Sequence, residues 1–591
     1  NNVNLAGNGN GDTLNASVTA DDIAITDSLH LPSTTLHLTA HNDISEIHLL
    51  TSASQTLNNA ELNATVQTYT DRVKIHFSPS SFIINDKKWN LEKDGELIVG
   101  NQFLSASEIK FSHEKQQLTI ATEPDDETNQ THIVAKLKDI SLEDFTPFVF
   151  KDPSLKGLVT GTAIIKNPFG KPILNFKGTA DSFYMNDKYV GKVEIENVDA
   201  NTATGKIKYK AYSDDTTNTF TVEGSYDLKD TTGNALNLEF MGKKINIDIL
   251  EPYMKSVFSR MSGPAQTNLK IYSKDGKQYI TGDTRLINDT IRIGYTQCTY
   301  ILKDQQIQFR ENEIDLGHLL LKDTLQNEGA LSGKIAHHFF SDLNFKNVNL
   351  ETGKLILLNT TRLDNSQFYG YVIGRANLKI NGPTTNMIMD ISGEPSKVDS
   401  SHIFLPTGEG REAGAIDYID FVQYGSQMED ELAGSDETNI IVNLALQANP
   451  ACKIDVILDE ETGDVVKGQG NGLINIRVGN KEPLTIRGRY ELTKGQYTFN
   501  FQTFLKKPFT LNKGSISWTG DPYLANLDIE AEYLAKKVDI SSLAASGRLV
   551  QKENVTIVGH IKGLMKQPDK PYFEFKLDEN SDAAKDYIIT K

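Results

Sequence analysis

Two groups of side chains in the sequence have the composition of a metal site. The segment DEETGD (459–464) gathers carboxylates, the oxygen ligands that Ca²⁺ prefers, and His337 and His338 are adjacent imidazoles. The carboxylates lack the spacing of a calcium-binding loop and join two alternating segments, which indicates a solvated hairpin tip. Adjacent residues of a strand point to opposite faces, so the two histidines do not converge on one ion. We therefore expect no metal site.

Nucleotide binding and catalysis each have one further candidate. GQGNG (468–472) has the glycine content of a phosphate-binding loop, but the apolar segment LINIRV follows it instead of a pyrophosphate-binding helix, which favours a turn or bulge. Cys298 and Cys452 are the two cysteines, and neither has the spacing of a catalytic or metal site. They exclude a disulfide framework, and a single long-range bridge is the alternative to two free thiols. Without a G-x-S-x-G or H-E-x-x-H motif, we expect neither an enzyme nor a cofactor.

The elements that would position any site are short alternating segments. From Pro483 to Tyr533, apolar and polar residues alternate through five successive runs, and a period of two puts alternate residues on opposite faces of a strand. The connectors Thr-Lys-Gly (493–495), Asn-Lys-Gly (512–514) and Gly-Asp-Pro (520–522) are turn signals. This pattern predicts an antiparallel meander of short strands with a single apolar face.

Composition and charge narrow the class of protein. The 591 residues carry a net charge of -18, which argues against nucleic-acid binding because the phosphates would be repelled. Hydrophobic residues make up 38% of the chain, so we do not expect strands buried on both faces to be the norm. No run of apolar residues is long enough to cross a bilayer as a helix. The chain begins NNVNLAGNGN, and we expect any targeting segment and anchor to lie upstream.

Changes in residue pattern and composition along the sequence predict that the chain has three parts. Residues 1–135 are short alternating strands, 136–350 combine helix-like pieces with strands, and 351–591 return to strands around an acidic, glycine-rich loop near 406–438. Within that loop, a spacing of three residues predicts a short amphipathic helix through Ile416, Ile419 and Val422. Loops of this length are usually functional or disordered.

The middle part contains two similar pieces. ISLEDFTPFVF and INIDILEPYMKSVF each precede a glycine-containing strand, with Pro147 matching Pro252 and Gly157 matching Gly263. We interpret them as repeat-like units in which a short helix caps the edge of a run of strands. Chance similarity between strand-rich segments is the alternative.

Several of these motifs together resemble the C-terminal domain of the TamB family, in its Bacteroidota-like form. The resemblance rests on Gly488-Arg489-Tyr490, on the block FTLNKGSISWTGDPY that ends at Tyr523, and on the upstream segments YGYVIGRANLKINGPTTNM and GALSGKIAHHFF. It implies an all-β fold with few short helices, in which an elongated, curled antiparallel sheet forms a U-shaped groove with an apolar interior. It also implies a periplasmic location, an N-terminal inner-membrane anchor, and an Omp85-family, TamA-like partner in the outer membrane.

The resemblance implies that the protein carries phospholipids along the groove between the two membranes. A second hypothesis is an assembly factor that holds strands of outer-membrane β-barrel precursors by β-augmentation. A third is a structural β-sandwich array, in which the aromatic side chains would fill a closed core. For the first hypothesis we expect the groove to be lined by Val372, Leu378, Ile380, Leu484, Ile486, Tyr497, Phe499, Phe501, Ile516, Trp518, Leu527 and Ile529.

Overall fold

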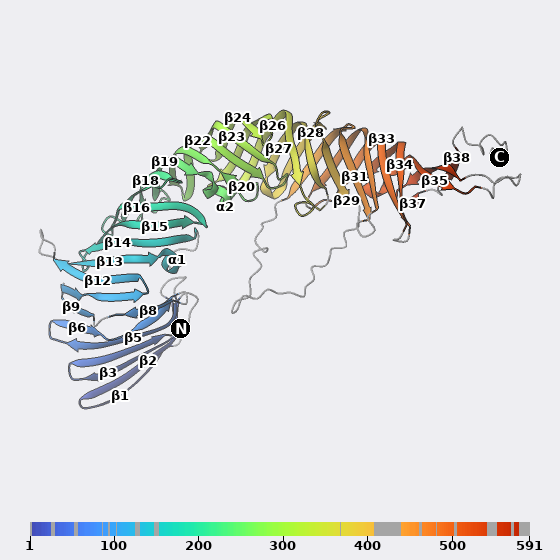
Figure 1. Ribbon diagram of the computed structural model, residues 1–591. Coiled ribbons are helices and arrows are strands. Elements are labelled where there is room, and N and C mark those ends of the chain that lie inside the picture. Colours follow the sequence, from blue (N-terminus) through green and yellow to red (C-terminus); the bar gives the residue numbers. More distant parts are fainter. Residues whose placement is uncertain are drawn as a thin grey trace. The chain divides into compact units, whose positions relative to one another are not determined.

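The protein is described by a computed structural model (Figure 1). The described residues are 3–24, 30–51, 57–84, 87–92, 95–101, 103–124, 131–146, 153–366, 368–406, 439–459, 464–479, 481–501, 505–540, 552–565, 567–568 and 572–577. All 38 strands within these ranges belong to one hydrogen-bonded sheet, and the few helices are short. The prediction of an all-β fold with few short helices is confirmed, and the sheet, predicted to be antiparallel, also contains two parallel pairs. By contacts, the chain divides into two units.

Unit 1 comprises Asn1–Pro252, Gly263–Arg285 and Phe309–Glu311. Its elements are β1 (Val3–Asn10), β2 (Thr13–Ala24), β3 (His30–His41), β4 (Ile44–Thr51), β5 (Leu57–Thr68), β6 (Arg72–Phe77), β7 (Ser81–Ile84), β8 (Lys87–Leu91), β9 (Glu96–Gly100), β10 (Phe103–Ser107), β11 (Ile109–His113), β12 (Gln116–Pro124), β13 (Thr131–Ser141), α1 (Leu142–Phe145), β14 (Leu155–Lys166), β15 (Ile173–Met185), β16 (Lys188–Asn201), β17 (Lys206–Asp214), β18 (Thr219–Asp227), β19 (Leu236–Asn246), η2 (Ile247–Leu250) and β21 (Pro264–Lys274). From β11 to β19, successive strands pair antiparallel.

Unit 2 comprises Tyr253–Ser262, Leu286–Gln308 and Asn312–Lys591. Its elements are β20 (Phe258–Ser262), β24 (Glu313–Asp323), β25 (Glu328–His338), β26 (Ser341–Thr360), β27 (Tyr369–Pro383), η3 (Thr384–Asn386), β28 (Met387–Pro395), β29 (Ser401–Pro406), β30 (Ile440–Ala448), β31 (Cys452–Asp459), β32 (Asp464–Gly479), β33 (Thr485–Phe501), β34 (Leu505–Gly520), η5 (Pro522–Leu524), β35 (Asn526–Val538), β36 (Glu553–Leu564), β37 (Gln567–Pro568) and β38 (Tyr572–Leu577). Three elements include residues of both units: α2 (Glu251–Met254), β22 (Lys277–Ile293) and β23 (Thr299–Arg310).

Two strand pairs of unit 2 are parallel. β28 pairs with β30 and β29 with β31 in parallel register, whereas their other neighbours are antiparallel. A parallel pair needs a crossover connection of a dozen or more residues, because the chain must return to the starting end of the sheet. The 32 residues 407–438, which join β29 to the start of β30, are long enough to meet that need. The helix predicted at Ile416, Ile419 and Val422 lies outside the described residues.

The predicted run of short strands between Pro483 and Tyr533 is wrong in one respect. Thr-Lys-Gly (493–495) lies inside the single strand β33, and Asn-Lys-Gly (512–514) lies inside β34. These segments interrupt the pairing without reversing the chain, so they are bulge-like irregularities instead of turns. Gly-Asp-Pro (520–522) does end a strand, since it runs from the last residue of β34 to the first residue of the short helix η5, which precedes β35.

Candidate functional site

A line of irregular pairing crosses the sheet of unit 2, and we call it the crease. It passes through 353–354 of β26, 396–400 between β28 and β29, 449–451 between β30 and β31, 469–470 of β32, 493–494 of β33 and 512–513 of β34. The register makes these positions neighbours, since Ala448 pairs with Gly472 and Gln469 pairs with Lys494. Irregularities of this kind bend a sheet and re-aim its side chains. One long strand can therefore supply apolar side chains on both sides of the crease, as β33 does with Ile486 and Tyr497, and we call the two sides of the sheet the two arms.

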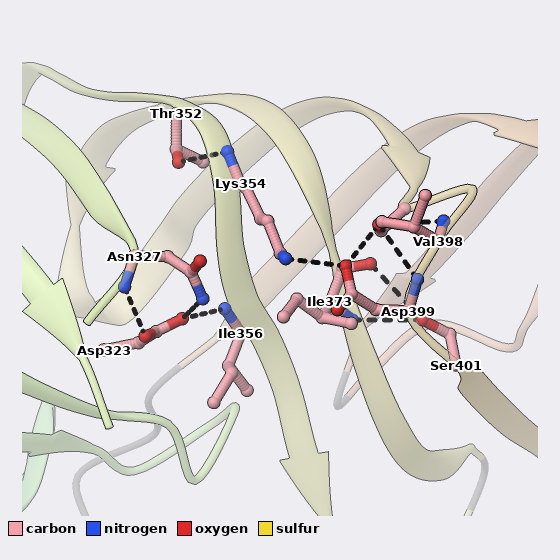
Figure 2. Close-up of polar contacts among 10 residues, drawn as sticks. Asp323, Asn327, Thr352, Lys354, Ile356, Ile373, Val398, Asp399 and Ser401 are labelled. Carbon is pink, nitrogen blue, oxygen red and sulfur yellow. Dashed lines mark hydrogen bonds and ion pairs between the residues drawn. The ribbon is translucent and has the colours of Figure 1, made fainter. Parts of the chain in front are cut away.

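Side-chain contacts hold the crease at β26 (Figure 2). Lys354 Nζ lies 2.8 Å from a carboxylate oxygen of Asp399, which also accepts a hydrogen bond from Ser396 Oγ at 2.5 Å. The buried Ser401 Oγ accepts from the backbone N–H of Ile373 at 3.1 Å. These contacts tie the loop between β28 and β29 to β26 and β27.

Asp323 makes a second set of contacts beside the crease. Its carboxylate, which has no exposed surface, accepts hydrogen bonds from the backbone N–H groups of Leu325, Asn327 and Ile356 and from Nδ2 of Asn327, all at 2.8–2.9 Å. A buried carboxylate is costly unless its lone pairs are satisfied, and here four donors satisfy it. The contact with Ile356 joins the β24–β25 turn to β26.

An apolar cavity of about 300 Å³ lies between the two arms. Among the residues that the structure describes, no charged side chain lines it, and most of the lining consists of aliphatic and aromatic groups. The lining residues are Leu405, Pro406, Val456, Val466, Leu484, Ile486, Tyr497, Phe509, Leu511, Ile516, Trp518, Pro522, Leu527, Ile529, Ala531, Gly559, Ile561, Met565 and Phe573. An adjoining smaller cavity of about 50 Å³ shares Ile486, Ile516 and Trp518 and adds Tyr490.

The apolar face extends from this cavity across six strands. By register, Leu350 pairs with Leu378, and the row continues through Ile391, Leu444, Ile476 and Ile486. Directly opposed residues of neighbouring strands share a face of the sheet. The row is therefore an unbroken apolar stripe from β26 to β33, where it meets the cavity at Ile486.

Burial controls the protonation of polar groups near this interior. Burial raises the pKa of Tyr490 well above its usual value and that of the Cys452 thiol to about 12. Burial likewise raises the pKa of Cys298 to about 11. Both cysteines are free, and thiols with such pKa values stay neutral near pH 7, which argues against a thiolate nucleophile.

The structure brings seven of the predicted lining residues to one cavity: Leu484, Ile486, Tyr497, Ile516, Trp518, Leu527 and Ile529. The side chains of Phe499 and Phe501 lie outside the described residues. Leu378 belongs to the apolar stripe and also borders an open concavity of about 620 Å³ lined mainly by polar side chains. Val372 and Ile380 are half-buried on β27 and line none of these three cavities.

Sequence reasoning missed the residues that complete the cavity from β29, β31 and β32. Leu405, Val456 and Val466 line it because the parallel pair of β29 and β31 carries them past the crease. Their alternation was visible in the sequence, for example Ile454 and Val456 around Asp455. The parallel pairing that brings them to the cavity had no local signal.

The remaining motifs take structural positions. His337 is buried and His338 exposed, as opposite faces require, and no group of metal-ligating side chains occurs within the described ranges. GQGNG (468–472) lies inside β32, so it is not a turn; a register shift falls between Gln469 and Gly470, and the extra residue there is Thr493 on the paired strand β33. The central residues of DEETGD (459–464) lie outside the part that the structure describes.

The comparisons with known proteins agree with this geometry. Residues 317–590 match the family model described as the TamB C-terminal domain, and no match was found among curated proteins. The family supports a role in outer-membrane assembly or lipid transport. Among the helices of the described ranges, none is long and apolar enough to cross a membrane. The part of the chain that holds the creased sheet and its apolar cavity, residues 317–590, belongs to the TamB family.

Proposed function

We propose that the protein carries phospholipids between the inner and outer membranes of a diderm envelope, with their acyl chains in the apolar cavity and along the apolar stripe. It would work in the periplasm, without enzymatic activity, together with an Omp85-family, TamA-like partner. The observation that supports the proposal is the uncharged cavity between the two arms, continuous with the row from Leu350 to Ile486.

The free energy of acyl-chain burial favours this proposal. A chain of about 16 methylenes gains on the order of 13 kcal/mol by leaving water, at about 0.8 kcal/mol per methylene. A continuous apolar face lets the chain move without returning to water. The outer face of β33 carries Arg487, Arg489 and Glu491, so on this strand a lipid headgroup has polar surroundings outside the cavity.

Site-specific photocrosslinking in cells tests the proposal. A photoreactive aromatic residue at Trp518, which lines the cavity, nearly conserves the size of the side chain. The matched control is the next residue, Thr519, which is exposed on the opposite face. We expect phospholipid adducts at position 518 and none at 519. Equal labelling at both positions would contradict the proposal.

A substitution pair measures the effect on transport. Ile516→Asp places an unpaired charge in the cavity, where burial is costly, whereas Thr519→Asp places one on the outer face opposite Arg487. We expect Ile516→Asp to reduce lipid transfer between donor and acceptor vesicles at least tenfold and Thr519→Asp to leave it within a factor of two. Unchanged transfer in Ile516→Asp would show that lipid does not use this cavity.

A second candidate function, assembly of β-barrel proteins, is favoured by β38. Within the described residues this strand pairs only with β36, which leaves its other edge open. It exposes Tyr572, Phe573 and Phe575, with relative exposures of 67%, 47% and 68%. An open, apolar edge can accept a strand from another protein. Protein adducts instead of lipid adducts in the photocrosslinking experiment would favour this function.

A further inference from the structure

The short helix α1 lies against two apolar clusters of unit 1. Phe145, at its last position, packs on a cluster that we call the Trp89 cluster, formed by the buried Ile84, Trp89 and Ile140 with surrounding aromatic side chains. Leu142, at its first position, packs on a neighbouring cluster around Phe220. Figure 1 shows α1 beside β13 and β14. The helix therefore covers apolar sheet surface at the junction of the two clusters.

An ion pair holds α1 on the sheet. Lys87 Nζ, at the start of β8, donates to both carboxylate oxygens of Asp144 in α1, at 2.9 and 2.8 Å. The Asp144 side chain is 1% exposed and that of Lys87 is 32% exposed. Removing Lys87 would leave the buried Asp144 carboxylate without its counter-charge, whereas removing the Asp144 charge would leave a partly solvated Lys87 and take away the contact that holds the helix. This contact joins residues 57 positions apart, and Lys87 Nζ also lies 3.9 Å from Glu143 of the same helix.

The same arrangement occurs a second time in unit 1. Lys188, at the start of β16, donates to Glu251, which follows η2, and Ile249 of η2 packs on the cluster around Phe220. Both lysines follow an Asn-Asp pair, in Asn-Asp-Lys at 85–87 and 186–188. The two copies associate a lysine that starts a strand with an acidic residue in or beside a short helix. This recurrence argues against a chance contact.

Trp89 beneath α1 carries an indole N–H that finds no acceptor among the described residues. Its side chain stacks on Phe82, with ring centroids 6.2 Å apart, and meets Phe145 edge-to-face at 5.7 Å. The residue is 1% exposed, and within the described residues its Nε1 has no hydrogen-bond partner. A buried indole N–H usually finds an acceptor. An oxygen-bearing ligand in this place would satisfy it, whereas the Phe145 ring offers no such acceptor.

We propose that the Trp89 cluster is a second acyl-chain site, covered by α1 and made accessible when the Lys87–Asp144 ion pair opens. The proposal rests on the lipid-carrying function proposed above. An acyl chain would replace the contacts of Phe145 and Leu142 with the sheet, and an ester oxygen of the lipid would accept from Trp89 Nε1. The ligand class is therefore an ester-linked lipid, not a free hydrocarbon.

The two tryptophans of the chain report separately on the two sites. Trp89 lies in the Trp89 cluster and Trp518 lines the cavity of unit 2. Trp518→Phe leaves Trp89 as the single reporter, and Trp89→Phe leaves Trp518. The probe is phosphatidylcholine vesicles with brominated acyl chains, which quench tryptophan on contact, compared with the same vesicles without bromine.

In the Trp518→Phe protein we expect little quenching of Trp89, and at least threefold more after Asp144→Asn. The matched control, Glu123→Gln, removes an exposed ion pair with Lys136 in the same unit (3.4 Å; side chains 55% and 64% exposed) and is expected to change nothing. Quenching that is the same with and without Asp144→Asn would overturn the proposal. Increased quenching by water-soluble acrylamide with no increase by the brominated lipid would also overturn it, because the cover would then open without lipid entering.

A second experiment fixes α1 over the Trp89 cluster with a covalent crosslink. Lys87→Cys with Asp144→Cys removes the ion pair, and a short thiol-to-thiol crosslinker then replaces it; the native Cys298 and Cys452 are each 1% exposed. We expect lipid quenching of Trp89 before crosslinking and its loss afterwards, and persistence of quenching afterwards would contradict a covering role for α1. Trp518, read in the Trp89→Phe protein, tests the proposed function on its own. Lack of lipid quenching there would count against the unit 2 cavity, whatever Trp89 shows.

Discussion

Asp289 on β22 is a carboxylic acid with no exposed surface, and the backbone N–H groups of Ile287 and Asn288 beside it offset only part of the effect of burial on its pKa. Burial raises its pKa to about 7. In the unfolded chain the same group ionises near its ordinary pKa of about 4. Between pH 4 and pH 7 the folded protein keeps the proton on Asp289, whereas the unfolded chain loses it. The free energy of unfolding therefore decreases as the pH rises from about 4 to about 7.

We expect Asp289→Asn to change this pH dependence. Wild type should lose on the order of 2–4 kcal/mol of unfolding free energy through this group between pH 4 and pH 8, and the variant should lack that loss. Urea denaturation of both proteins at the two pH values measures the difference. Asp283→Asn, at an exposed position of the same strand, is the control and should follow wild type. Parallel pH profiles for wild type and Asp289→Asn would refute the assignment.

Strand elements depend on glycine where the crease brings two backbones together. A Cβ on Gly470 of β32 would lie 2.0 Å from the backbone oxygen of Glu491 on β33, so the strands would have to separate. We expect Gly470→Ala to destabilise the protein by about 2–3 kcal/mol, as overpacking does. Gly353, in the crease on β26, has open space around the same position. Gly353→Ala should therefore stay within about 0.5 kcal/mol of wild type in urea denaturation, and equal losses for both variants would contradict this account.

The strands and their apolar faces could be predicted because side-chain alternation is local. Ile486 and Ile516 were assigned to one face from their neighbours alone, and both line the cavity. The sequence did not distinguish the irregular pairing of the crease from a turn between two strands, because Thr-Lys-Gly at 493–495 has residue types that occur in both. One signal was available in the sequence: the apolar residues stand at even positions up to Leu492 and at odd positions from Tyr497. A bulge produces this change, because its extra residue shifts the alternation of the side chains by one position. Which strands pair in parallel depends on contacts far apart in sequence, and no local pattern encodes them.

At the scale of the whole molecule, a sheet without one central core is stabilised mainly by contacts between neighbouring strands. Most strands contact only their sheet neighbours, so a defect is expected to weaken the unit that contains it more than a distant one. Trp89 lies in unit 1 and Trp518 in unit 2, and the single-tryptophan proteins therefore report the unfolding of each unit. Comparing the two reporters shows whether the two units unfold independently or in one transition.

We expect Gly470→Ala in unit 2 to lower the urea midpoint reported by Trp518. The midpoint reported by Trp89 should stay equal, within error, to that of the same single-tryptophan protein without Gly470→Ala. The converse substitution is Val159→Ala, which removes the two γ-methyl groups of a buried side chain in the cluster around Phe220 of unit 1 and should cost about 1–3 kcal/mol. It should lower the Trp89 midpoint and spare that of Trp518. Equal shifts of both midpoints by either substitution would instead establish a single cooperative transition over the chain. A local defect could then not open one unit alone, and lipid entry beneath α1 would require only the movement of that helix.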